Sequence, residues 1–274
     1  MFLQKEKKYL ERVKAEILKS GFPLELYARD TILQSGLILS SSKHFLDEDS
    51  EKREIDLEAS FQIVDGSYIG RLPLLDVLLI ECKKNENSPW VFFSDLFVNS
   101  GTNFLLKSGN RNELINLARY APQLKHHHNK APNIASSYVL PFKSEDSKEA
   151  RQIYEAISKL VSCYRFANRK LPRNFRSKDT LAFYYHLIVL FEGKLLLATK
   201  KDNDLFLKSV RHVVVNHIEP GPVSDSYFVI DIVHRDYLEK YLSKIKAEHL
   251  NLQRWLDKHG VPLARLKKLP IDRK

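Results

Sequence analysis

"LLDVLLIECKKNENSPW", residues 74–90, begins as an apolar segment and ends in charge. The apolar run up to Ile80 predicts a buried β-strand, because short continuous apolar runs are typical of strands covered on both faces. Glu81 and Lys83 follow, separated by one residue. Successive side chains of a strand alternate between its two faces, so this acid and this base project together while Cys82 projects oppositely. The question is why a core strand should end in such a pair.

The preceding segment supplies a second carboxylate. "REIDLEASFQIV" (53–64) alternates apolar and polar residues as a half-buried strand does, and Gly66 and Gly70 indicate a turn after it. If the two strands pair as an antiparallel hairpin around that turn, Asp56 lies across from residues 80–84. The hairpin then gathers two carboxylates and one ammonium group at its open end.

Such a cluster favours a metal ion. Two converging carboxylates repel, which raises the pKa of one of them unless a cation lies between them. Mg²⁺ or Mn²⁺ suits oxygen ligands of this kind, and the backbone carbonyl of Cys82 is a further potential ligand. The ion would activate a water and neutralise charge on a phosphate oxygen, while Lys83 would orient that water or stabilise the developing charge. We therefore expect Asp56, Glu81 and Lys83 to converge at the mouth of a positively charged cleft and to hydrolyse phosphodiesters.

These residues resemble a known family. "EID" (54–56) followed by "IECKK" (80–84) resembles the PD-(D/E)XK nuclease superfamily, which has a restriction-endonuclease-like core. Glu25, in "SGFPLELYARDTILQSG", resembles the acid that many members carry on the first core helix. "SPWVFF" (88–93) resembles the corresponding run of uncharacterised bacterial members. The resemblance covers residues 5–95, and Glu54 stands where the superfamily has its nominal proline.

The resemblance implies a function and a set of roles. Asp56 and Glu81 would bind Mg²⁺ or Mn²⁺, Glu25 would support the metal, and Lys83 would be the catalytic lysine. The substrate would be nucleic acid, most simply DNA, and by analogy the enzyme would serve restriction, defence or repair. Many members act as dimers, so the resemblance also allows a homodimer.

Composition and patterning indicate an α/β or α+β protein. The chain has 274 residues, of which 43% are apolar and 11% aromatic, which is enough for a sizeable core. The resemblance implies one restriction-endonuclease-like α/β domain, 1–274, with a mixed β-sheet flanked by helices. The core motifs fall in 20–95, later strands and helices in 136–258, and a basic tail in 259–274. Residues 95–135 form an irregular middle segment.

Local patterns predict the individual elements. Apolar spacing and capping signals predict helices over 5–19, from Pro23 to before Gly36, around 111–120, over 144–166 and, as a long C-terminal helix, over 236–258. Apolar and aromatic runs predict strands over 136–142, 183–191, 194–199, 212–218 and 227–233, with the second and third of these joined at Glu192-Gly193 as a hairpin. "HFLDEDSEKRE" (44–54) is predicted to be a charged loop.

Positive charge is concentrated in two places. The formal net charge is +10, and residues 165–178 contain six basic residues and no acid. Clusters of this kind suit a polyphosphate, because the release of condensed counterions favours association with nucleic acid. We expect phosphate contacts from the basic C-terminal tail and from Lys84, Arg169, Lys170, Arg173 and Arg176. The alternative is a solvated basic face.

Each catalytic interpretation has a structural alternative. Glu81 and Lys83 could form an ion pair at a frayed strand end, and Asp56 could line a solvated acidic face. Glu25 could simply be an acid in the first turn of a helix, where it interacts favourably with the helix dipole. The whole chain could then be a catalytically inactive nucleic-acid-binding or scaffold protein that keeps the fold. A glycosidase using the two acids is a weaker option, because a lysine lies beside them.

Other features predict no chemistry. The histidines at 126–128 are interpreted as a polar loop, and His212 and His217 as structural or surface groups. Two cysteines, Cys82 and Cys163, are too few for a disulfide framework and are expected to be reduced. The sequence has neither a phosphate-binding Gly-rich loop nor an apolar run approaching the roughly 20 residues of a membrane span. We therefore expect a cytoplasmic protein without a membrane anchor.

Overall fold

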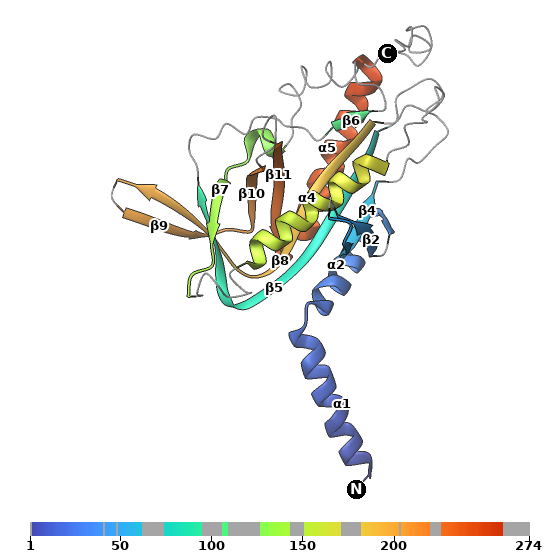
Figure 1. The fold of residues 1–274 in the computed structure, drawn as a ribbon, viewed down its shortest axis with the longest axis vertical. Coiled ribbons are helices and arrows are strands. Elements are labelled where there is room, and N and C mark those ends of the chain that lie inside the picture. The colour runs from blue at the N-terminus through green and yellow to red at the C-terminus, as the bar shows by residue number, and fades with distance from the viewer. Residues whose placement is uncertain are drawn as a thin grey trace.

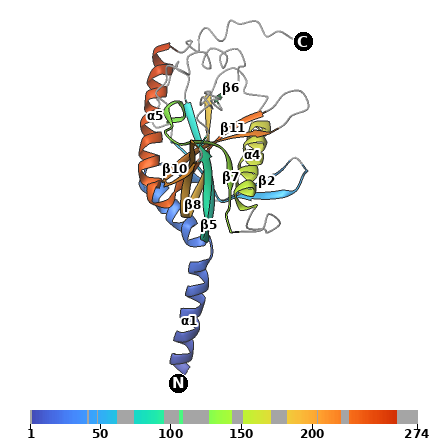
Figure 2. The same cartoon turned by 90° about the vertical axis from the view of Figure 1, so that its left-hand side faces the viewer.

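The computed structural model describes residues 2–40, 42–47, 49–61, 74–94, 106–108, 127–142, 151–170, 182–202, 204–219 and 226–259. It is a mixed α/β structure with one large mixed sheet, which helices cover on both faces (Figures 1 and 2). The predicted mixed sheet with flanking helices and a long C-terminal helix is confirmed. None of the described helices is long and apolar enough to cross a membrane.

Two helices precede the sheet. α1 (Phe2–Lys19) projects away from the rest of the protein, whereas α2 (Phe22–Gln34) packs against it (Figure 1). Pro23 stands in the first turn of α2, where its missing N–H costs nothing. Leu24, Ala28 and Ile32 recur at helical spacing and are fully buried. Both helices match the predicted ones.

Four short strands follow α2. β1 (Ile38–Ser40) pairs antiparallel with β4 (Leu57–Ser60), and β2 (Lys43–Leu46) pairs antiparallel with β3 (Lys52–Ile55) in a separate two-stranded sheet. The predicted charged loop over 44–54 is therefore wrong at both ends. Only its centre turns, where Asp47 accepts hydrogen bonds from the backbone N–H groups of Asp49 and Glu51.

The sheet is built around two long parallel strands. β5 (Leu74–Ser94) pairs in parallel with β8 (Ala182–Lys201) over 74–85 and again over 90–93, with a register shift between. α4 (Gln152–Lys170) lies in the connection between them, as a parallel pairing requires. β5 thus runs on past Glu81 and Lys83, and the expectation that the strand ends there is wrong.

Gly193 explains why the predicted hairpin at Glu192-Gly193 is also wrong. β8 continues straight through these residues, because Gly193 pairs with Asn85 at the register shift of β5. The glycine has a φ of +154°, and a Cβ at this position would overlap the Asn85 backbone oxygen and the Phe191 ring. Glycine is therefore needed for a close strand approach and not for a turn.

The remaining strands extend the sheet from β8. β11 (Ser226–His234) pairs in parallel with β8, and β10 (His212–Glu219) pairs antiparallel with β11. β7 (Ile134–Val139) pairs with both β10 and the end of β5, so the strand path returns to β5. β6 (Leu106–Ser108) and β9 (Asp204–Ser209), which were not predicted, pair with β8.

Alternate residues of β5 face two separate cores. Val77 and Leu79 belong to the core beneath α4, together with Ile153, Ala156, Ile157, Leu160 and Val161 of the predicted amphipathic helix. Leu78 and Ile80 belong to the core beneath α2 and α5 (Leu238–His259). Residues 81 and 83 therefore continue the α4 face, and Cys82 continues the opposite one.

Several predicted features lie outside the described residues. These are the turn at Gly66 and Gly70, the helix around 111–120, most of the basic segment 165–178, and the tail from residue 260 onward.

We expect Gly193→Ala to destabilise the protein by roughly 1–3 kcal/mol, since the added methyl forces strain at the β5–β8 junction. Urea unfolding followed by the fluorescence of Trp90, which is buried against Phe191, measures this loss. Gly21→Ala is the matched control, because Gly21 has helical dihedral angles and open space around it. Equal stability of both variants would contradict the proposed role of Gly193.

Candidate active site

The hairpin register brings Asp56 opposite Glu81. β4 pairs antiparallel with β5, with Leu57 opposite Ile80, so the residue before Leu57 comes opposite the residue after Ile80. The predicted antiparallel pairing and register are confirmed. Asp56 itself lies at the bend between β3 and β4, where the chain passes from the two-stranded sheet to the large one.

Glu81 is a buried carboxylate between two lysines. Its side chain is 1% exposed. Lys83 Nζ lies 2.8 Å from Oε1, and Lys159 Nζ lies 2.8 Å from Oε1 and 2.7 Å from Oε2. The interpretation as an ion pair at a frayed strand end is wrong, because the pair is in the interior of β5 and its acid is inaccessible to solvent.

Asp56 shares the same ammonium group. Its Oδ1 lies 3.5 Å from Lys159 Nζ, while its Oδ2 accepts a hydrogen bond of 2.7 Å from the Cys82 backbone N–H. Its side chain is 18% exposed, so it does not line a solvated acidic face. One cation therefore contacts both carboxylates, and a backbone donor fixes the orientation of one of them.

Lys159 was not predicted from the sequence. It comes from α4, where it follows Ala156 by three residues and precedes Cys163 by four, and both of these neighbours are fully buried. Residues three and four apart share a helix face. A lysine on the apolar face of a predicted amphipathic helix is thus the signal that could have identified it.

The charges of this cluster are strongly coupled. Burial raises the pKa of Glu81, and Asp56 raises it further, while Lys83 and Lys159 oppose both effects. Burial lowers the pKa of Lys159, but the two carboxylates outweigh it and the net shift is upward. The ammonium form of Lys159 is therefore stabilised beside the two acids.

Glu25 adds a third carboxylate near the first two. It lies in the first turn of α2 and is partly buried. Burial raises the pKa of its carboxyl group, and Asp56 and Glu81 raise it further. Three carboxylates thus interact with two ammonium groups, those of Lys83 and Lys159, so the cluster keeps a surplus of negative charge.

Cys82 and Lys84 project to the other face of β5. The Cys82 thiol belongs to the core beneath α2 and α5, and burial raises its pKa well above the usual value. Cys82 contributes to the site through its backbone N–H, which donates a hydrogen bond to Asp56. Lys84 Nζ lies 2.8 Å from Glu86 Oε1, and it donates a hydrogen bond of 2.9 Å to the Leu18 carbonyl.

The other predicted phosphate contacts lie at or beyond the end of α4. Arg169 is exposed in its last turn, and Lys170 is its last residue. Arg173 and Arg176 lie outside the described residues. Lys159 and Arg169 share one helix, so α4 connects the carboxylate site to the start of the basic segment.

A pocket of about 580 Å³ opens beside the site. Its described lining comes from Glu81 and Lys83, from the β2–β3 hairpin, from α4 and from the end of β10. The lining contains five acidic and four basic side chains, among them Asp49, Arg53 and Arg165. The described walls therefore carry mixed charge and differ from the positively charged cleft that we expected.

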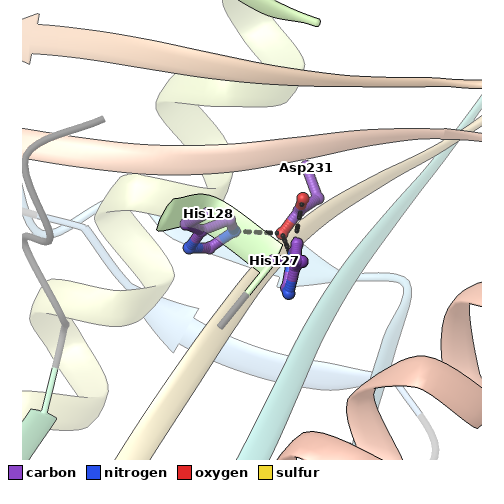
Figure 3. A group of neighbouring side chains, drawn as sticks. All are labelled: His127, His128 and Asp231. Carbon is purple, nitrogen blue, oxygen red and sulfur yellow. Dashed lines mark hydrogen bonds and ion pairs between the residues drawn. The ribbon is translucent and has the colours of Figure 1, made fainter. Parts of the chain in front are cut away.

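A second polar cluster lies on the opposite face of the sheet. His127 and His128, in a short 3₁₀ helix (η3, His127–Lys130), both point to Asp231 on β11 (Figure 3). His127 is 3% exposed, and Asp231 is fully buried. The interpretation of this stretch as a polar loop is wrong for these two histidines, and His126 lies outside the described residues.

Carboxylates surround His127 on both sides. Its Nε2 lies 3.1 Å from Asp231 Oδ1, and its Nδ1 lies 2.7 Å from Glu248 Oε2 of α5. Burial lowers the pKa of His127, but these acids outweigh it and bring the pKa to about 9. Burial lowers the pKa of the neighbouring His128 to about 4. His212, predicted to be structural or at the surface, also contacts Asp231, at 2.7 Å.

Comparison with protein-family models, with curated proteins and with solved structures found no match for this chain. The functional assignment therefore depends on the chemistry of its own side chains.

We expect Lys159→Met to lower the free energy of unfolding by about 1–3 kcal/mol, because Glu81 stays buried with one cation instead of two. Adding Glu81→Gln should recover part of this loss, since the charge that lacked its partner is removed. Urea unfolding of the single and double variants measures the coupling. Lys19→Met, which breaks the exposed Glu16–Lys19 pair, should leave the unfolding midpoint unchanged. If the stability losses of the two single variants simply add up in the double variant, the proposed interaction between Lys159 and Glu81 is contradicted.

Proposed function

We propose that this protein is a metal-dependent nuclease that hydrolyses phosphodiester bonds, with DNA as its substrate. One observation carries the proposal. A single cationic atom, Lys159 Nζ, lies 3.5 Å from Asp56 and 2.7 Å from Glu81, so the two carboxylates are close enough to share one ion. Carboxylate oxygens are the ligands that Mg²⁺ and Mn²⁺ prefer.

The arrangement of the chain supports the same conclusion. Glu25 on the helix before the sheet, Asp56 at the bend just before β4, and Glu81 with Lys83 on β5 come from three parts of the chain and interact at one place. This is the order of residues in which the sequence resembles the PD-(D/E)XK nucleases. A restriction-endonuclease-like core within the mixed sheet belongs to the proposal.

The side chains have distinct roles in the proposed reaction. Asp56 and Glu81 would hold Mg²⁺ or Mn²⁺, and the N–H of Cys82 would keep the Asp56 carboxylate in place. Glu25 would add negative charge around the ion. Lys83 would orient the attacking water or stabilise the negative charge that develops on the phosphate oxygens. When bound, the ion would supply Lewis-acid stabilisation of the phosphate and make the water more acidic.

Lys159 would have to yield its place when a metal binds. It is a flexible side chain with 25% exposure beside an open pocket, so its ammonium group can move towards solvent. In the pocket it would remain close enough to contact a substrate phosphate. The net charge of +10 and the basic segment 165–178 support a polyanionic substrate.

Cleavage of plasmid and linear DNA in the presence of Mg²⁺ or Mn²⁺ tests the proposal. We expect Asp56→Ala and Lys83→Ala to lower the rate by about 100-fold or more, as loss of one charge-stabilising group commonly does. Glu16→Gln removes an exposed carboxylate on α1 and serves as the control. Cleavage that persists at the normal rate in both site variants would refute the proposed site.

A scaffold without catalysis is the rival function, and one observation favours it. Lys159 already lies between Asp56 and Glu81, so the charges of these two carboxylates are compensated without a metal, and only the Glu25 charge is left over. Calorimetric titration with Mn²⁺ separates the two. A nuclease should bind the ion, and Lys159→Met should bind it more tightly because the competing ammonium is gone. No binding heat from either folded protein would favour the scaffold.

A further inference from the structure

The cluster under α5 is a second concentration of ligand-type side chains. Three imidazole Nε2 atoms surround one buried carboxylate. They lie 3.1 Å (His127), 2.8 Å (His128) and 2.7 Å (His212) from the nearest oxygen of Asp231. These side chains come from η3, β10 and β11, and η3 is distant in the sequence from the two strands.

The hydrogen bonding of His127 creates a chemical problem. A neutral imidazole has one N–H donor and one lone pair. If Nδ1 donates to Glu248, then Nε2 directs a lone pair at the Asp231 carboxylate, which is repulsive. In the metal-free protein the second proton that Asp231 and Glu248 hold on His127 removes this repulsion, and a metal ion bound at Nε2 would take the place of that proton.

The geometry also suits a metal ion. One ligand atom from each of His127, His128 and Asp231 lies within 4.8 Å of the others (Figure 3). Two imidazoles and a carboxylate form a ligand set that suits borderline divalent ions such as Zn²⁺. Metal-bound histidines commonly donate their other N–H to a carboxylate, and Glu248 lies in that position for His127.

We propose that His127, His128 and Asp231 bind one Zn²⁺ ion, with Glu248 orienting His127 and His212 orienting Asp231. A tetrahedral ion would have one position left for water. The His127 and Asp231 side chains are fully buried and that of His128 is 12% exposed, so the site is structural and has no access for a large substrate. The ion would join η3 to β11 and, through Glu248, to α5.

This site is independent of the proposed nuclease site. Glu81 pairs with Val189 of β8, and Val189 pairs with Ile232 of β11, so these residues share the α4 face. Asp231 precedes Ile232 by one residue and therefore faces the opposite side of the sheet. Nitrogen ligands also favour Zn²⁺ over Mg²⁺, whereas the oxygen ligands at Asp56 and Glu81 favour Mg²⁺.

The test first removes all metals from the full chain with a chelator and then measures how much added zinc the chain binds. It is run in the Asp56→Asn/Glu81→Gln background, so that the carboxylate site cannot contribute. We expect one Zn²⁺ per chain by elemental analysis and competition with a chromogenic chelator, and a visible absorption spectrum when Co²⁺ is substituted. Both cysteines are buried and do not compete for the ion. No zinc above the level of a protein blank would overturn the proposal.

Variants locate the ion. His128→Gln should lose the tightly bound zinc, and Glu248→Gln should bind it about 10–100-fold more weakly, as loss of a supporting hydrogen bond does. His44→Gln, which changes an exposed histidine of β2, should bind as the parent does. Parent-like affinity in a folded His128→Gln variant would overturn the proposal. If that variant does not fold, parent-like affinity of Glu248→Gln has the same consequence.

Discussion

The burial of Glu81 inside a parallel strand pair constrains how β4, β5 and α4 can be arranged around it. A carboxylate removed from water needs compensating charge, and here Lys83 of the same strand and Lys159 of α4 supply it. α4 must therefore lie close over β5 at this point, and it does so by packing its apolar face on the sheet. Asp56 reaches the same ammonium because the β4–β5 register places it opposite Glu81. Packing and charge thus specify one arrangement.

The alternation of side chains on the sheet separates two kinds of polar cluster. On the α4 face, carboxylates and lysines meet beside an open pocket. On the α5 face, histidines and carboxylates meet in a buried environment, with Asp231 fully enclosed. The ligand types differ between the two clusters: the oxygen ligands of the α4 face suit Mg²⁺ or Mn²⁺, and the nitrogen ligands of the α5 face suit Zn²⁺.

Local patterns predicted much of this fold, since helices, strand alternation and the Asp56–Glu81 register depend on near neighbours. Contacts between distant segments could not be predicted in this way. Lys159 lies 78 residues from Glu81, and His127 lies 104 residues from Asp231, so their meeting depends on the tertiary fold. Gly193 was interpreted as part of a hairpin turn because the residue that requires a glycine there, Asn85, lies on the partner strand and is far away in the sequence. The sequence predicted the part of the site that the β4–β5 pairing brings together, namely Asp56, Glu81 and Lys83. It did not predict Lys159, which comes from α4.

Anomalous X-ray scattering from crystals soaked in Mn²⁺ would show whether Asp56 and Glu81 converge on one cation position. We expect a manganese peak bounded by oxygens of both carboxylates, with Lys159 displaced towards the pocket. Crystals that show no peak at saturating Mn²⁺, with the Lys159 ammonium still between the two acids, would contradict it.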